Sequence, residues 1–504
     1  MPILAETQPA EPAAAPLWPH QQKAIDFALS RPASLLGLPM GSRSGKSRVA
    51  IETADRDHAM RVLIAAPKSV LGVWPSQFAE YSPRNWLVWN GTVIGARGPK
   101  TSPTVAERAQ AIGQAIGQAQ LEGRPVAIAV NHEALWQPAM LDVLLHAGFT
   151  MLVADESHRW KSPSGKASKA GARLAATVRA QGGRVLLLTG TPMPHTPLDL
   201  WAQIRALDGG QRLGTSHYRF CHEYGEGEQI WAPGGVQRTK WTGIRPDRAE
   251  AFAAKTRTVL FQVDRAQLDA TLALPATFAT TRSCQLAPAT RKAYDALESD
   301  LIADVDGGVI TASNRMVLTT RLAQLSGGFA RTAAGDVVQV GTEKEQLLAD
   351  VLADLPRGEP VVVFARFRAD LDAIERVAAA ADRAYGELSG RRRDALAPDS
   401  TLAPGVLVAG VQLQSGGVGV DFTAARTAIY YSLDFSLADH DQSRKRLHRP
   451  GQHRTVTYAY LIAEDTIDHA VLGALRKRQD AVQAALEHIR TGAHPHPQAQ
   501  ARAA

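Results

Sequence analysis

Short apolar runs that end in small or polar residues alternate with longer helical stretches along most of this chain. Runs of strand length in the first half are VLIAAP (62–67), VAIAV (126–130), MLVADE (151–156) and VLLLTG (185–190). Stretches of helical length, such as 104–121 and 166–180, separate them. Strands that are buried on both faces read as continuous apolar runs, and helices between them favour parallel pairing. The sequence therefore predicts an α/β fold with parallel sheets covered by helices on both faces.

The same alternation divides the chain into two lobes. It weakens between about 205 and 283 and then resumes with VVVFARF (361–367), GVLVAG (405–410) and TAIYYS (427–432). We predict a first lobe over 17–262 and a second lobe over 284–491, joined by a connection at 263–283. The end of the first lobe, 205–262, is rich in Gly, Trp and Tyr and is interpreted as a small insertion.

Composition limits the class of protein. Hydrophobic residues make up 45% and charged residues 21% of 504, which is typical of a soluble globular chain and excludes a largely disordered one. No apolar run approaches the ~18 residues of a membrane-spanning helix, and the N-terminus lacks the pattern of a secretory signal. Two cysteines, Cys221 and Cys284, exclude a disulfide framework and favour the cytoplasm. The Ala/Pro-rich stretches 1–16 and 492–504 are expected to be flexible tails.

The charge balance favours a polyanionic partner. The formal net charge is +7, and the excess is uneven, because 442–454 holds five Lys or Arg residues and no acid. A basic run is often only a solvated face, so composition alone makes nucleic acid a hypothesis.

A phosphate-binding loop is predicted between an apolar run and a helical stretch, at MGSRSGKS (40–47). In such a loop the backbone N–H groups of a Gly-rich turn surround phosphates at a helix N-terminus. Gly41 and Gly45 would form the turn, Lys46 would reach the β- and γ-phosphates, and the Ser47 hydroxyl would bind Mg²⁺. The usual pattern has Gly where Met40 stands, and Gly41 is displaced by one position.

Polar residues at two later strand ends extend this prediction. Asp155 and Glu156 follow an apolar run; Asp155 could hold Mg²⁺ through its water shell and Glu156 could polarise the attacking water. Thr189 and Gly190 end the next run, at the sheet edge where ligands gather in open α/β sheets, although a plain turn is the alternative.

The order of these motifs resembles the Swi/Snf-type branch of helicase superfamily two, whose members are ATP-driven translocases on double-stranded DNA. The similarity covers nearly everything from Leu17 to about Ala485. It implies two RecA-like lobes of the P-loop NTPase fold, with ATP between them and nucleic acid across both.

In the first lobe the resemblance assigns roles to three segments. Gln21, in LWPHQ (17–21), is similar to the glutamine that recognises adenine. The segment Pro67, Lys68 and Ser69 resembles the first motif that contacts the DNA backbone, and Asn131 occupies the place of the next such motif. DESHRWKSPSGKASKA (155–170) and LTGTPMPHTPLDLWAQ (188–203) are long matches, although His195 stands where the family usually has Asn.

In the second lobe QSGGVGVDFTAA (414–425) is similar to the motif that contacts DNA and the nucleotide ribose. This implies DNA contacts at Ser415 and Gly416 and nucleotide contacts at Gly419 and Asp421, with Asp421 in place of a common Asn.

QSRKRLHRPGQ (442–452) resembles the signature with two arginine fingers, here Arg446 and Arg449, preceded by the nucleotide-contacting Gln442. The planar guanidinium suits this role because it gives several charge-assisted bonds to a phosphoryl group. A further stretch, 321–328, resembles compact bacterial and phage members, so a bacterial cell or infected host is the expected setting.

The sequence therefore predicts a DNA-dependent ATPase that uses ATP and Mg²⁺ to translocate along double-stranded DNA without sequence preference, with no membrane partner and no identifiable protein partner. A strand-separating DNA or RNA helicase, and a DNA-binding module that uses ATP only as a switch, are the alternatives.

Other conspicuous residues have simpler readings. Cys221 and His222 are too few for a metal site, so packing is expected. Trp231 and Trp241 could stack on bases, but a small satellite core is the usual role of such residues. The run 391–393, three arginines, either meets phosphate or lies in a solvated loop.

Overall fold

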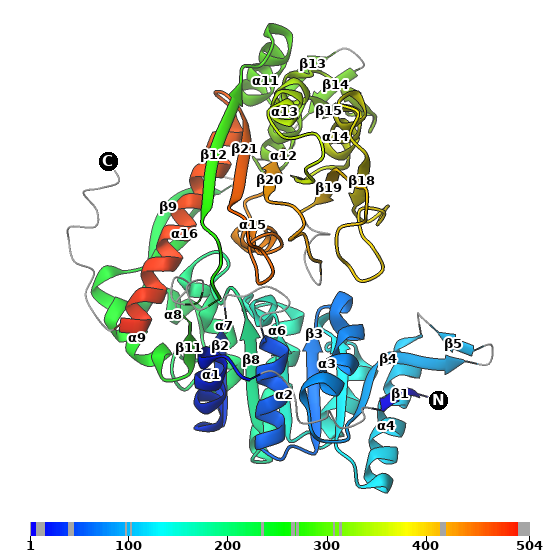
Figure 1. Cartoon of the computed structure of the whole chain (residues 1–504). Helices are drawn as coiled ribbons and strands as arrows, with labels where there is room; N and C mark the ends of the chain where they lie inside the picture. Colours follow the sequence, from blue (N-terminus) through cyan, green and yellow to red (C-terminus); the bar gives the residue numbers. More distant parts are fainter. Residues whose placement is uncertain are drawn as a thin grey trace. The chain divides into compact units, whose positions relative to one another are not determined.

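The computed structural model describes residues 2–6, 16–38, 45–95, 98–100, 103–232, 236–263, 268, 272–305, 308–311, 315–413 and 420–491. These residues form two compact units, each with its own sheet (Figure 1). Unit 1 holds the described chain up to Leu268 together with the helix turns from Asp480 on, and unit 2 holds the described residues between them. The two predicted α/β lobes are confirmed.

The sheet of unit 1 has the strand order β1-β4-β6-β3-β7-β8-β2-β11, with β5 beside β4. Every pair from β4–β6 to β2–β11 is parallel, whereas β1 and β5 pair antiparallel with β4. The strands are β1 Pro2–Glu6, β2 Ala33–Gly37, β3 Arg61–Ala66, β4 Leu87–Gly95, β5 Gly98–Lys100, β6 Val126–Asn131, β7 Met151–Asp155, β8 Arg184–Thr189 and β11 Leu260–Gln262. The predicted apolar runs of the first half are thus parallel neighbours.

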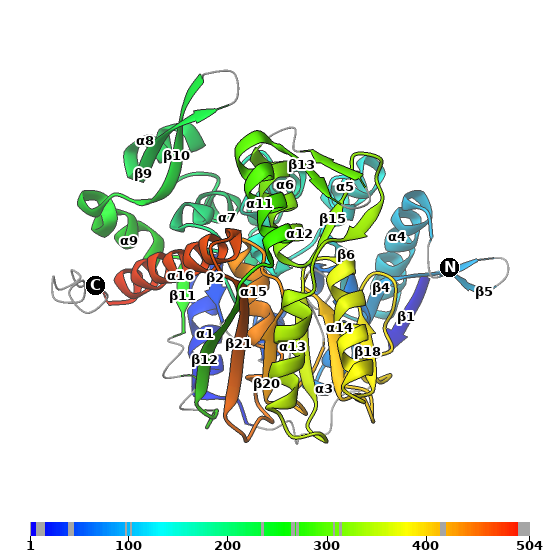
Figure 2. The ribbon, with the colours of Figure 1, turned by 90° about the horizontal axis from the view of Figure 1, so that it is seen from above.

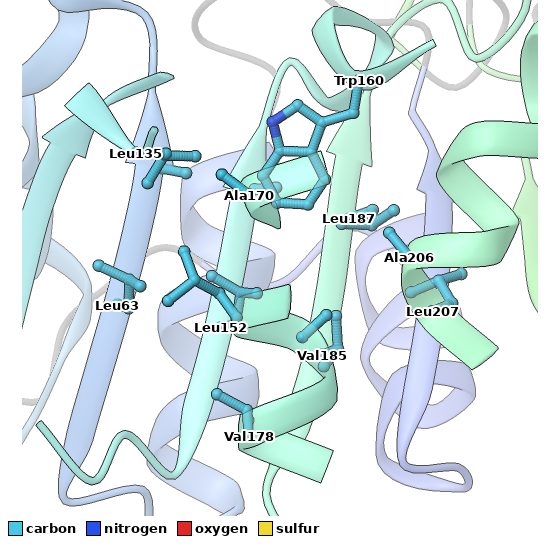
Figure 3. Packing of buried hydrophobic residues seen from close by; sticks show 14 of the residues in the cluster. Leu63, Leu135, Leu152, Trp160, Ala170, Val178, Val185, Leu187, Ala206 and Leu207 are labelled. Carbon is cyan, nitrogen blue, oxygen red and sulfur yellow. The ribbon is translucent and has the colours of Figure 1, made fainter. Parts of the chain in front are cut away.

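Helices cover both faces of this sheet. They are α1 Pro19–Leu29, α2 Lys46–Arg56, α3 Trp74–Tyr81, α4 Val105–Glu122, α5 Pro138–His146, α6 Lys166–Ala180, α7 Leu200–Asp208, α8 His217–Tyr224 and α9 Ala249–Arg257. Figure 1 shows α1, α2 and α3 in front of the strands. Alternate strand residues such as Leu63, Leu152 and Leu187 pack with α4 to α7 in the main core (Figure 3). This follows from the alternation of side chains along a strand.

Unit 2 has an all-parallel sheet of order β12-β21-β20-β17-β19-β18. Its strands are β12 Thr277–Cys284, β17 Val361–Ala365, β18 Tyr385–Leu388, β19 Val408–Gln412, β20 Thr427–Tyr430 and β21 Val456–Ala463. Its helices are α11 Pro288–Asp300, α12 Arg315–Ser326, α13 Glu343–Ala353, α14 Arg368–Ala380, α15 Leu437–Arg444 and the start of α16 Ile467–Thr491. Helices α13 and α14 cover one face (Figure 2), and α11 and α12 form a second core with the hairpins β13–β14 (Ile302–Val305, Gly308–Thr311) and β15–β16 (Phe329–Arg331, Val337–Gln339).

The boundaries differ from the prediction at three places. The expected N-terminal tail contains β1, which pairs with β4 because the edge of the sheet offers free backbone groups. The expected connection at 263–283 contains most of β12, whose β-branched residues pair with β21. The last turns of α16 belong to unit 1, and Ile489 is a member of its core. The predicted tail 492–504 lies outside the described residues.

The segment 205–262 is part of the first lobe rather than a separate satellite. It forms α8, the hairpin β9–β10 (Gly225–Ala232, Val236–Ile244) and α9, and then returns to the sheet as β11 beside β2. Phe220 and Cys221 belong to the main core, and Trp241 packs against it. The packing role of Cys221 is confirmed, whereas the satellite core expected for Trp241 is wrong; the side chain of Trp231 lies outside the described residues.

None of the helices that the structure describes has the length and apolarity needed to cross a membrane.

Asp370 in the first turn of α14 is a buried carboxyl group in unit 2. Its Oδ2 accepts hydrogen bonds from Phe367 N at 3.2 Å and from Ser432 Oγ at 2.5 Å, while Oδ1 has no partner among the described residues. Burial raises the pKa of Asp370 to about 6, against the opposing effects of these hydrogen bonds and of Lys344.

We therefore expect Asp370→Asn to stabilise the protein at neutral pH relative to the wild type. A carboxyl whose pKa is higher in the folded state binds protons on folding, so its charged form costs stability above pH 6 and that cost disappears as the pH falls. The advantage of the Asn variant should shrink by about 1 kcal/mol between neutral pH and about pH 5, as measured by urea unfolding. Asp354→Asn, at an exposed carboxylate, is the control; a difference independent of pH would contradict the shifted pKa.

Candidate active site

The predicted phosphate loop lies between a strand and a helix, as expected. β2 precedes the loop and Lys46 is the first residue of α2. Gly45 caps this helix with φ +80°, a left-handed conformation that favours glycine. Ser47 is half-buried in the first turn. Met40 and Gly41 lie outside the described residues, so the displaced glycine stays a prediction.

Gln21 of α1 lies against this loop. A Cβ added at Gly45 would overlap with the Gln21 side-chain amide, so a larger residue at 45 would displace it. The Gln21 Oε1 accepts a hydrogen bond from Trp18 N at 2.9 Å, which fixes the direction of the amide. The structure therefore brings the predicted adenine-recognising residue and the phosphate loop together.

Lys46 meets the two predicted carboxylates at the end of β7. Its Nζ lies 2.5 Å from Glu156 Oε1 and 4.0 Å from Asp155 Oδ1, and the three side chains are largely buried. Glu156 has φ +53°, a strained conformation for a residue with a side chain, and its N–H donates to Asp155 Oδ1 at 3.0 Å. The acidic turn is thus held in one defined geometry.

The two carboxyl groups have different pKa values because Lys46 is closer to one of them. Burial raises the pKa of Asp155 to about 6, with Lys46 opposing and Glu156 adding to the shift. Burial would also raise the pKa of Glu156, but the charge of Lys46 and the hydrogen bond from His158 outweigh it and lower that pKa well below the usual range. Glu156 is therefore the charged partner of Lys46 in this structure.

The donor set fits a nucleotide phosphate with Mg²⁺. A lysine at a helix N-terminus suits a phosphate, and a serine hydroxyl and a carboxylate are oxygen ligands of the kind that Mg²⁺ accepts. The described residues contain no cluster of three His, Cys, Asp or Glu side chains that could hold a metal by themselves.

The acidic turn is linked to the end of β8. His158 Nδ1 lies 3.3 Å from Glu156 Oε2 and 3.0 Å from Thr189 Oγ1. The Thr189 hydroxyl also accepts a hydrogen bond from Thr191 N at 3.1 Å, and Thr189 is fully buried. The Thr189 hydroxyl therefore links the ends of neighbouring strands, and the nucleic-acid contacts expected of Thr189 and Gly190 stay predictions.

The predicted DNA-contact segments of unit 1 lie at the same sheet edge. β3 and β6 are parallel neighbours with Ala66 opposite Asn131, so the segments that follow them are adjacent. Pro67 is buried and Lys68 is exposed at the start of a 3₁₀ helix, Lys68–Val73, that includes Ser69. The Asn131 side chain accepts a hydrogen bond from Arg108 at 3.1 Å and donates one to Glu133 at 3.0 Å.

Unit 2 brings its own predicted residues together. Arg449 Nη1 donates to Val420 O at 3.0 Å and lies 3.7 Å from Asp421 Oδ2. The backbone O of Arg446 accepts from Phe422 N at 3.0 Å, and both arginines are buried. The segment after α15, the helix that carries Gln442, is thus packed on the segment that carries Asp421. Ser415, Gly416 and Gly419 lie outside the described residues.

Two of the three arginines at 391–393 form ion pairs within unit 2, and Arg393 is exposed. Arg391 pairs with Asp372 and Glu387, and Arg392 pairs with Glu375 and Asp394, all at 2.9 Å or less. These ion pairs account for Arg391 and Arg392, while the two alternatives for the run, a phosphate contact or a solvated loop, stay predictions.

Sequence reasoning overlooked a histidine behind the acidic turn. His132 is buried, and its ring nitrogens lie 2.8 Å from Asp155 O and 3.1 Å from Trp160 Nε1. Burial lowers the pKa of His132 to about 4, so the ring is neutral at neutral pH. His132 directly follows Asn131 and Trp160 lies within the stretch 155–170, but no sequence pattern indicates that these two side chains are in contact.

Two family profiles match the chain and together cover most of it. The SNF2-related domain matches residues 49–326, and the helicase conserved C-terminal domain matches residues 343–451. The chain belongs to the SNF2-related family. Its two lobes are therefore of the RecA-like type that the resemblance implied. The second profile contains both predicted arginine fingers, Arg446 and Arg449, whereas the first begins just after Lys46 and Ser47.

Curated relatives of this SNF2-related protein are distant and longer. It is 25% identical over 476 residues to the SWI/SNF-related matrix-associated actin-dependent regulator of chromatin subfamily A-like protein 1 homologue of Caenorhabditis elegans, across 92% of this chain and 61% of that protein. The corresponding protein of Drosophila melanogaster is 25% identical, across 68% of this chain and 42% of its own length. The DNA annealing helicase and endonuclease ZRANB3 of Homo sapiens is 24% identical, across 67% and 30%.

Among solved structures, the Sulfolobus solfataricus SWI2/SNF2 ATPase core in complex with dsDNA aligns with a TM-score of 0.39 and 19% identity, over 96% of this chain and 98% of that one.

Proposed function

We propose that this SNF2-related protein is an ATPase that is stimulated by double-stranded DNA and translocates along it, and so remodels DNA or protein–DNA complexes. The main support is the contact of Lys46 with Glu156 and Asp155. A lysine at the first position of a helix after a Gly-containing loop, facing an Asp–Glu pair at the end of another strand of the same sheet, is the arrangement that nucleotide hydrolysis requires.

In this proposal ATP binds as its Mg²⁺ complex to the residues of unit 1. Gly45 and Lys46 would hold the phosphates, Ser47 and Asp155 the ion, and Gln21 the adenine. Glu156, which is charged, would accept a hydrogen bond from the attacking water and orient it. The bound ion neutralises phosphate charge that develops during the reaction.

The partner is proposed to be the phosphate backbone of DNA. Lys68 is exposed beside Asn131 at the sheet edge that also carries the acidic turn, and the net charge of +7 attracts a polyanion. Phosphate contacts carry no direct sequence information, so weak sequence preference follows. The relative named as a DNA annealing helicase also favours DNA, although this chain spans only 30% of it.

The residues of unit 2 are proposed to complete the nucleotide and DNA contacts. Asp421 and Gln442, with Gly419, would contact the nucleotide, and Arg446 and Arg449 would stabilise the phosphoryl group in the transition state. Their support is the common packing of the two segments that carry Asp421 and Arg449.

ATP turnover should rise several-fold with blunt double-stranded DNA and much less with RNA. The protein should also displace a triplex-forming strand from a duplex without separating the duplex strands. DNA stimulation should weaken steeply with added salt, because each phosphate contact releases counterions. Coupled ATPase assays and gel-based triplex and fork assays measure these three quantities.

Two controls separate the proposal from its alternatives. The Lys46→Ala protein gives the background of contaminating ATPases. Efficient unwinding of a fork would identify a strand-separating helicase, and ATP binding without turnover would identify an ATP-switched DNA-binding module.

A further inference from the structure

His132 lies between two segments that the proposed function treats separately. It follows Asn131, the proposed DNA contact at the end of β6, and its ring reaches the acidic turn at the end of β7. β3 lies between these two strands in the sheet, so the side chain of His132 spans the width of one strand. Only 1% of His132 is exposed.

The hydrogen bonds of His132 define its tautomer. The indole Nε1–H of Trp160 can only donate, so His132 Nδ1 at 3.1 Å must accept. The proton of the neutral ring is then on Nε2, which donates to the backbone O of Asp155 at 2.8 Å. The two rings meet edge to face at 85°. Trp160, the last residue of the 3₁₀ helix Ser157–Trp160, is buried (Figure 3) and packs against Gly171 of α6. Both ring nitrogens are satisfied and the ring has one orientation.

This donor holds the peptide group that joins Asp155 to Glu156. The C=O of that peptide accepts from His132, and its N–H donates to Asp155 Oδ1. Both polar atoms of the peptide are thus fixed just before Glu156, whose φ of +53° costs about 1–2 kcal/mol. Without the histidine donor, this peptide group would keep only the hydrogen bond of its N–H, and the backbone that orients the Glu156 side chain would be held less firmly.

A second contact joins the same two segments. Glu133 accepts from Asn131 at 3.0 Å and pairs with Arg159 at 3.0 Å, next to Trp160. The residues on both sides of His132 are therefore connected to the DNA-contact segment and to the turn that carries Glu156.

We propose that His132 is a positioning residue that orients Glu156 for turnover and ties its position to the DNA-contact segment at Asn131. The inference rests on the proposed function for its effect on turnover, and on the contacts alone for its effect on the turn.

In the experiment His132→Phe should keep ATP affinity within a few-fold of wild type. DNA-stimulated turnover at saturating ATP should fall about 10²-fold, as expected for a displaced catalytic group. His132→Gln, whose side-chain amide can donate in place of Nε2–H, should recover much of this loss. Trp160→Phe removes only the donor to Nδ1 and should have a smaller effect in the same direction. His146→Gln, at an exposed histidine that bonds within α5, is the matched control.

A second readout does not depend on activity. Hydrogen–deuterium exchange of the segment 151–160 should be faster in His132→Phe and close to wild type in His132→Gln, while 184–189 in β8 stays unchanged. Unchanged exchange at 151–160, or turnover lost equally in the Phe and Gln variants, would overturn the positioning role. If the wild type shows no ATP turnover while the exchange difference is present, the proposed function fails and the orienting of the turn by His132 stands.

Discussion

The Lys46→Ala protein should have no measurable ATP turnover and a lower free energy of unfolding than the wild type. In the structure Lys46 is the cation beside two buried carboxylates, at 2.5 Å from Glu156 Oε1 and 4.0 Å from Asp155 Oδ1. Removing one member of a buried ion pair leaves an uncompensated charge and typically costs about 3–5 kcal/mol. Turnover is lost because the phosphates lose the same cation.

A double-mutant cycle separates these two effects. Adding Glu156→Gln to Lys46→Ala removes the uncompensated charge, so most of the lost stability should return while turnover stays absent. Glu156→Gln alone should bind ATP at least as tightly as the wild type, because the carboxylate 2.5 Å from Lys46 is replaced by a neutral amide, and should not turn it over. Urea unfolding, calorimetric ATP affinity and ATPase assays give the three quantities.

Two outcomes would contradict this account. If Lys46→Ala unfolds at the same urea concentration as the wild type, the ion pair with Glu156 contributes nothing in solution. If the affinity for DNA without nucleotide collapses together with turnover, Lys46 supports the DNA-contact surface rather than the phosphates.

Much of the fold could be predicted because most of its strands can be recognised from their own residues. Buried parallel strands such as β3 and β8 are continuous apolar runs, and their carboxyl ends carry the polar residues that form the site. β1 and β12 could not be predicted in this way. Each is a strand because of a partner far along the chain, β4 or β21, and neither has a fully apolar run of its own.

The same distinction between local and long-range signals applies to the residues of the candidate site. Residue types with a local motif, such as Lys46 at the end of a Gly-containing loop and Asp155 after a strand, were predicted and lie together. Thr189 and His132 show what the pattern omits. Whether a hydroxyl or imidazole faces a ligand or a neighbouring strand end depends on packing between strands, and the structure places both inside.

Substitution of Arg446 or Arg449 should reduce turnover far more than ATP affinity. An arginine finger acts mainly on the charge that develops in the transition state and is typically worth ~10³–10⁵ in rate. Arg→Lys keeps the charge but loses the planar fork, so we expect it to fail almost as badly as Arg→Ala. The measurements are ATP affinity and DNA-stimulated turnover for each single variant.

The contacts of Arg449 require their own control, because its guanidinium donates to Val420 O and faces Asp421 Oδ2 at 3.7 Å. Arg449→Ala could therefore disturb the segment around Asp421 as well as the chemistry. Asp421→Asn removes the charge near Arg449 and keeps an oxygen to accept from Thr423 N and Oγ1, at 2.9 and 2.7 Å, so it tests the contact without removing the arginine. We expect that variant to retain most of the turnover. If Asp421→Asn loses as much turnover as Arg449→Ala while ATP affinity is unchanged, Arg449 is a packing residue of unit 2, whereas a fall in ATP affinity would report the proposed nucleotide contact of Asp421. Two outcomes would change the role of either arginine. A variant at Arg446 or Arg449 that keeps half of the wild-type turnover would remove that arginine from the catalytic set. Turnover that falls only in step with ATP affinity would make the arginine a binding residue.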